Sequence, residues 1–140
     1  MLHAPHNTAR ALLASALLAA AAPLALAQSE AGRMPPLHEE GSLQYSCGGI
    51  GLDESTAMRA AMKDYPLSLL FAAREGEYLA DITVEIRGAR DSYRFVAGGP
   101  VCLLRLPEGA YTVQATTRNG RTQSQQTHVG KGSHSLDFRF

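Results

Sequence analysis

The sequence predicts a mainly β protein, a β-sandwich of about seven strands with one helix near the N-terminal end. From Leu67 onward, short stretches of alternating apolar and polar residues recur about every eight to twelve residues, which is typical of a sandwich. Turns rich in glycine, proline and asparagine separate these stretches. The helical pattern lies ahead of them, from about Asp53 to Asp64.

The first 27 residues are expected to form a secretory signal peptide that the mature protein lacks. Weakly basic His3, His6 and Arg10 precede an apolar run, and Ala25-Leu26-Ala27 fits the rule for cleavage after small residues. Gln28 would then begin the mature chain. No later apolar stretch reaches the roughly 20 residues of a membrane helix. We therefore expect a periplasmic or secreted protein that does not insert into a membrane.

The rest of the chain divides into an arm and one domain. Residues 28–44 contain glycines and prolines with few apolar residues, which predicts a flexible N-terminal arm, and residues 45–140 are expected to form a single domain. Without Arg10 the chain has 12 basic and 13 acidic residues, and its arginines are scattered among acids. Nucleic acid and acidic membranes attract clustered positive charge, so neither is an expected partner.

Cys47 and Cys102 are the two cysteines of the chain. In an exported protein, thiols meet an oxidising environment and tend to pair. A catalytic thiol would need an activating base, and two cysteines so far apart lack the spacing of metal ligands. A disulfide is therefore predicted, with two buried free thiols as the alternative.

The expected helix follows a glycine-rich turn, Gly48 to Gly51. Asp53 is the predicted cap at its start, and Pro66 ends it. Glycines before a helix can bind an anion through backbone N–H groups, but two acids occupy the first turn, which favours a structural turn. The helix is expected to bury an apolar stripe formed by Met58, Ala61, Met62 and Tyr65.

Seven strands follow from the alternation of residues. Ile82, Val84 and Ile86 should face a core, and the run from Val101 to Leu106 is apolar enough to be buried on both sides. Asn119-Gly120 predicts a two-residue hairpin turn. The expected strands are 67–71, 79–87, 93–96, 101–106, 110–117, 122–129 and 133–140.

Three segments carry a family resemblance: Leu79-Ala80-Asp81-Ile82-Thr83-Val84, Gly99-Pro100 leading into Leu104, and Leu106-Pro107-Glu108-Gly109-Ala110-Tyr111-Thr112-Val113. This series resembles the carboxypeptidase regulatory-like modules, which have a transthyretin-like (prealbumin-like) β-sandwich. The resemblance covers about half of the chain, roughly 67–140. The segment from Tyr45 to Met58 is similar to small exported bacterial proteins that pair such a helix with such a sandwich. Because these modules serve as accessory, adhesive or surface-binding units, the resemblance implies a fold and no particular reaction.

No residue pattern indicates an enzyme. The hydroxyisourate hydrolases, an enzymatic branch of the transthyretin-like fold, end in a Tyr-Arg-Gly-Ser signature, whereas this chain ends Asp137-Phe138-Arg139-Phe140. His128 and His134 flank a tight connection and would face each other across a hairpin, where they could share a metal ion, but two surface histidines are the simpler interpretation. We therefore expect no catalytic residues, no metal and no cofactor.

The stretch Thr122 to His128 is unusual because it is extended by context yet lacks apolar residues on either face. Such a strand is a solvated sheet edge or lines a polar recognition surface. The predicted function is an exported, non-enzymatic binding or accessory module that recognises a protein or a polar ligand, such as a glycan or an added peptide strand. The alternative is a structural protein that assembles through an exposed sheet edge, and a hydrolase ranks third. The candidate binding residues are Gln114, Thr116, Arg118, Ser124, Gln126 and His128.

Overall fold

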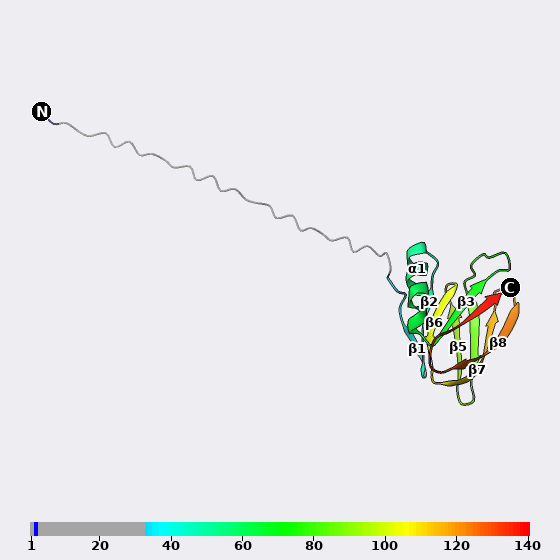
Figure 1. Ribbon diagram of the computed structural model, residues 1–140. Helices are drawn as coiled ribbons and strands as arrows, with labels where there is room; N and C mark the ends of the chain where they lie inside the picture. The colour runs from blue at the N-terminus through cyan, green and yellow to red at the C-terminus, as the bar shows by residue number, and fades with distance from the viewer. Residues whose placement is uncertain (1, 3–32) are drawn as a thin grey trace.

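The computed structural model of the protein describes Leu2 and residues 33–140 (Figure 1). The predicted signal peptide, apart from Leu2, and its cleavage site lie outside the described residues. In the described part, nine strands form two sheets, and one α-helix, α1 (Leu52–Ala61), continues into a 3-10 turn, η1 (Met62–Asp64). No helix in this part is long and apolar enough to cross a membrane. The prediction of a mainly β sandwich with one helix is confirmed.

One sheet has five strands and the other has four. The order in the five-stranded sheet is β1 (His38–Glu40), β2 (Leu43–Gly48), β6 (Val101–Arg105), β3 (Leu67–Ala72) and β9 (His134–Arg139). The order in the four-stranded sheet is β5 (Ser92–Ala97), β4 (Ile82–Arg87), β7 (Gly109–Thr116) and β8 (Thr122–Val129).

All seven predicted strands are present, six of them with shifted ends, and β1 and β2 are additional. The five-stranded sheet includes the hairpin of residues 38–44, which the sequence assigns to the arm. Leu43 is fully buried in the core, and Ser46 donates a hydrogen bond to the carbonyl of Pro35 at 3.1 Å. Leu43, Tyr45 and Cys47 alternate with polar residues in β2 and face the main core, so this strand has a local signal that the arm assignment overlooked. β1 has no such signal, because it is polar throughout and is placed only by its pairing with β2.

The main core lies between the two sheets. Side chains at alternate positions of each strand point inward, as the period of two requires. Ile82, Val84 and Ile86 are buried as predicted, and they face inward together with alternate residues of β7. The largest side chains of this core that are fully buried are Phe71, Phe138, Leu43, Leu67, Leu69, Ile82, Ile86 and Leu104.

A second, smaller core lies under α1, on the outer face of the five-stranded sheet (Figure 1). Met58 is fully buried there against Val101 and Leu103 of β6. Ala61, Met62 and Tyr65 pack around this group, so the predicted apolar stripe is confirmed. β6 is therefore buried on both faces, as predicted for a central strand.

The start of α1 differs from the prediction. The cap residue is Gly51, with no side-chain cap, and Asp53 lies one residue inside the helix, so its predicted role as the cap is wrong. The reason is that Glu54 turns back toward the preceding loop, where its Oε1 accepts the N–H of Gly49 at 2.7 Å. A carboxylate of the chain itself thus accepts a hydrogen bond from one backbone amide of the turn in which anion binding was considered.

Cys47 and Cys102 form a disulfide, as predicted. They are direct partners in the antiparallel pair β2–β6, with Cα atoms 4.2 Å apart. The bond ties the N-terminal hairpin to the central strand of the five-stranded sheet.

β9 belongs to the opposite sheet from β8, which corrects the expected hairpin of His128 and His134. β9 pairs with β3 in parallel, from Leu67 opposite His134 to Ala72 opposite Arg139. Alternating Leu136, Phe138 and Phe140 are buried in the main core, so apolar packing places this strand. The two histidines therefore lie on edge strands of different sheets.

The turn between β7 and β8 is longer than predicted. Thr117 N–H donates to the carbonyl of Arg121 at 2.8 Å, and Gly120 N–H donates to that of Thr117 at 3.0 Å, so three residues lie between the paired positions. Only Gly120 has a positive φ, 84°, whereas a two-residue turn of type I′ needs two such residues.

Candidate binding surface

The outer face of the four-stranded sheet is polar, and no helix of the described residues covers it. Thr112 of β7 lies between Arg87 of β4 and Gln126 of β8, and Gln114 lies between Glu85 and Ser124 in the next row. We call this surface the polar face. Its members on β4, β7 and β8 are Thr83, Glu85, Arg87, Ala110, Thr112, Gln114, Thr116, Thr122, Ser124, Gln126 and His128.

The register brings five of the six predicted binding residues together on the polar face. Gln114 is the partner of Ser124, Thr116 is the partner of Thr122, and Gln126 and His128 pair with Thr112 and Ala110. Opposed side chains on one sheet face are neighbours, so these polar groups form one continuous area.

Arg118 is the exception among the predicted residues. It lies in the turn after β7, where its guanidinium is 3.5 Å from the carboxylate of Asp81, and both side chains are largely exposed. The sequence groups Arg118 with the outward residues of β7 by extending the strand, but β7 ends at Thr116. Arg118 therefore belongs to the end of the sandwich.

Charge is unevenly distributed over the polar face. Glu85 accepts hydrogen bonds from Arg94 of β5 at 2.8 Å and from Arg87 at 3.4 Å, so the charges on the β4–β5 side are largely paired. The β7–β8 side carries amides and hydroxyls, and the hydroxyls of Thr116 and Thr122 lie 2.9 Å apart. This half of the face suits uncharged hydrogen-bonding groups.

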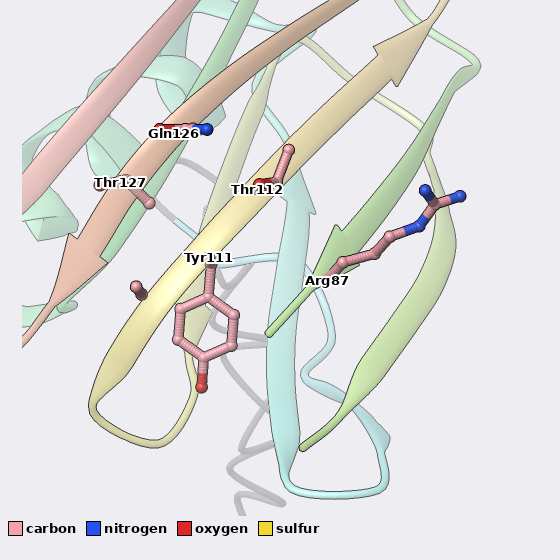
Figure 2. A pocket seen from close by; sticks show the side chains of 6 residues that line it. Arg87, Tyr111, Thr112, Gln126 and Thr127 are labelled. Carbon is pink, nitrogen blue, oxygen red and sulfur yellow. The ribbon is translucent and has the colours of Figure 1, made fainter. Parts of the chain in front are cut away.

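An open hollow of about 430 Å³ lies where β4, β7 and β8 are adjacent. Figure 2 shows Arg87, Thr112 and Gln126, which come from these three strands, with the ring of Tyr111 on the opposite side of β7 from Thr112. The small side chain of Ala110 leaves the hollow open. The candidate residues chosen from the sequence miss Arg87 and Thr112, because only the register between strands places them beside Gln126.

The inward face of β8 has a structural role that the sequence does not indicate. Gln125 Nε2 donates to the carbonyl of Asp137 at 2.8 Å, and Gln123 Nε2 donates to the carbonyl of Arg139. These carbonyls belong to β9, the edge strand of the other sheet. We call these contacts the glutamine seam. It satisfies backbone groups of an exposed edge and explains why β8 has polar residues on both faces.

The described residues contain no group of three or more His, Cys, Asp or Glu side chains that could hold a metal ion.

Near the hollow, Tyr111 donates its hydroxyl hydrogen to the carbonyl of Pro107 at 2.6 Å. Burial raises the pKa of Tyr111, and the nearby Tyr93 and Asp91 raise it further. The phenol therefore stays protonated and serves as a structural donor at the turn into β7.

No protein-family model and no curated protein matches this chain. The resemblance to transthyretin-like modules therefore stays a prediction.

Proposed function

We propose that the protein is an exported, non-enzymatic binding module that captures an extended, polar segment of a partner protein along β8 and the polar face. The open edge of β8 carries this proposal. Partner recognition by strand addition uses backbone hydrogen bonds for affinity and neighbouring side chains for selectivity.

The pairing of β7 with β8 determines which backbone groups of β8 are free. The bond between Thr117 N–H and the carbonyl of Arg121 begins a ladder in which bonded pairs recur at every second position, 115–123, 113–125 and 111–127. The N–H and C=O groups of the residues between them therefore point away from β7, at the open edge. These residues are Thr122, Ser124, Gln126 and His128, whose side chains also lie on the polar face.

The edge of β8 lacks the features that usually prevent strand addition. Its eight residues include no proline and no lysine, and the register with β7 runs without a bulge. The glutamine seam holds the inward side chains of β8, so the edge is ordered before a partner arrives. An ordered edge lowers the entropy cost of binding.

The side chains around the edge favour a neutral, polar segment. Gln126, Ser124 and Gln114 offer donors and acceptors, and Arg87 in the hollow can donate hydrogen bonds to one acidic or amide side chain of the segment. Among the described residues, no hydroxyl of this face bonds to a histidine or a carboxylate, which supports binding rather than nucleophilic catalysis. The predicted signal peptide and the disulfide support export.

Replacement of Ser124 tests the proposal. Ser124→Pro removes one outward N–H and adds a ring at the edge, while the bonds to β7 remain, whereas Ser124→Ala keeps the backbone donor. Peptides selected from a random library on the wild-type protein should bind Ser124→Ala normally and lose at least about tenfold in affinity for Ser124→Pro. Equal binding to both variants, with unchanged melting temperatures, would contradict strand addition.

Two further measurements separate the alternatives. Replacing Gln114 and Gln126 together by alanine should weaken the selected peptides if the polar face contributes selectivity. Sedimentation of the wild-type protein without peptide tests the assembly alternative: a concentration-dependent dimer that Ser124→Pro abolishes would assign the edge to a second copy of the chain.

A further inference from the structure

A second cavity, of about 290 Å³, lies at the end of the sandwich where the β7–β8 turn faces the segment that leads into β4. It is separate from the hollow on the polar face, because the two share no lining residue. We call it the end cavity. Neither the β8 edge nor the polar face contributes to it.

The floor of the end cavity is apolar. Ile82 and Phe140 belong to the main core, and Leu79 packs against that core from the segment before β4. Ala73 and Ala80 also line it, and their short side chains leave space above the floor. An apolar floor of this size can hold one ring or one branched alkyl group.

The rim of the end cavity is cationic. Arg118 and Arg121 both line it from the β7–β8 turn. The side chain of Arg121 makes no hydrogen bond or ion pair with the described residues. Arg118 contacts Asp81 at 3.5 Å, but these side chains are 80% and 50% exposed, so water screens the pair and another carboxylate can replace Asp81 at little cost.

Hydrogen bonds fix the backbone of the turn that carries the two arginines. The backbone bonds of Thr117 described above close the turn, and Arg121 N–H donates to the hydroxyl of Thr117 at 3.0 Å. Opposite the turn, Asp81 has a φ of 56°, a conformation that is uncommon for residues other than glycine. This conformation directs the chain from Ala80 on the cavity wall to Ile82 on its floor.

We propose that the end cavity binds a small organic carboxylate with an aromatic or branched aliphatic group. The apolar group lies on Leu79, Ile82 and Phe140, and the carboxylate is directed to Arg118 and Arg121. Guanidinium groups recognise carboxylates through paired charged hydrogen bonds. Small inorganic anions can bind the arginines too, but they have no apolar group to bury on the floor, so they should bind more weakly. This site is independent of the peptide-binding function proposed above.

Titration of the isotopically labelled protein, followed by NMR, tests the proposal. Phenylacetate and 4-methylpentanoate are the probes, and their neutral amides are the matched controls. The acids should shift the amide signals of Leu79, Ile82, Arg121 and Phe140 with a Kd of about 1 mM, and the amides should bind about tenfold more weakly. Equal affinity of acid and amide, or no shifts at about 20 mM acid, would overturn the proposal.

Variants make the test specific. Arg118→Gln/Arg121→Gln should abolish the preference for acid over amide, while Arg90→Gln, which removes one positive charge at an exposed position outside the cavity, should leave it intact. Ala80→Leu fills the cavity and keeps both arginines, so it should weaken acid and amide alike. Unchanged binding to the double arginine variant or to Ala80→Leu, in proteins with wild-type melting temperatures, would place the ligand elsewhere.

Discussion

The two sheets present outer faces of opposite character. On the five-stranded sheet, Val101 and Leu103 of β6 point outward and α1 covers them with Met58. On the four-stranded sheet, the corresponding outward positions of β7 are Thr112, Gln114 and Thr116, and no described helix covers them. The outward residues of the central strand thus decide whether a sheet face is covered, since only an apolar face gains from burial.

The five-stranded sheet, which α1 covers, also contains the disulfide. The first prediction therefore compares how the two sheets respond to reduction of this bond. Reduction of Cys47–Cys102 removes a link across 55 positions, which should lower the free energy of unfolding by about 4 kcal/mol. Hydrogen exchange after reduction should accelerate first in β2 and α1, and later in β4 and β7.

The double variant Cys47→Ala/Cys102→Ala is the control for the reductant. It should show the same order of exchange without any reducing agent. Simultaneous acceleration in both sheets would show that the disulfide stabilises the domain as one unit.

The second prediction compares one position on each outer face. Met58→Ala leaves a cavity under α1 and should lower the free energy of unfolding by about 3 kcal/mol, because the side chain is fully buried. Thr112→Ala on the polar face should change it by less than about 0.5 kcal/mol. Chemical denaturation measures both, and similar losses would mean that the polar face is buried in solution.

The third prediction concerns the glutamine seam at the open side of the sandwich. Gln123→Ala/Gln125→Ala removes two donors to β9 and should cost about 1–2 kcal/mol of unfolding free energy. It should also increase aggregation, because the carbonyls of a sheet edge become available. Gln126→Ala, which changes the outward side of the same strand, is the matched control and should behave like the wild type in denaturation and light scattering.

The smallest expected effect is at Tyr111, which bridges the core and the turn before β7. Tyr111→Phe removes the bond to the carbonyl of Pro107 and should cost about 1 kcal/mol at neutral pH. The folded-state pKa of Tyr111 is raised, so above about pH 10 the unfolded phenol ionises first and the wild type loses stability as the pH rises.

The phenylalanine variant should therefore lose less stability than the wild type when the pH is raised above about 10. Parallel pH profiles for the wild type and Tyr111→Phe would contradict the raised pKa.

Local alternation and turn residues determined the sandwich, its seven strands from Leu67 onward, the stripe of α1 and the burial of β6 on both faces. These features follow from periodicity, which each segment carries by itself. The cysteine pair was also predictable, because the predicted export and a count of two cysteines leave few alternatives. Only the tertiary structure decided that β1 joins the sheet and that β2 pairs with β6, although Leu43, Tyr45 and Cys47 already alternate in the sequence. It also decided that the Glu54 carboxylate, and not that of Asp53, bonds to the turn before α1, and that β9 returns to β3.

The candidate sites divide in the same way. The sequence singled out the polar stretch in β8 and the outward residues of β7, but it placed Arg118 with them and missed Arg87 and Thr112. Register with β4 and the bend of the chain at Gly120 settle those positions, and both depend on contacts between distant segments. The roles of Gln123 and Gln125 were equally hidden, because their partners are backbone carbonyls of β9, which become neighbours of β8 only when the two sheets pack face to face.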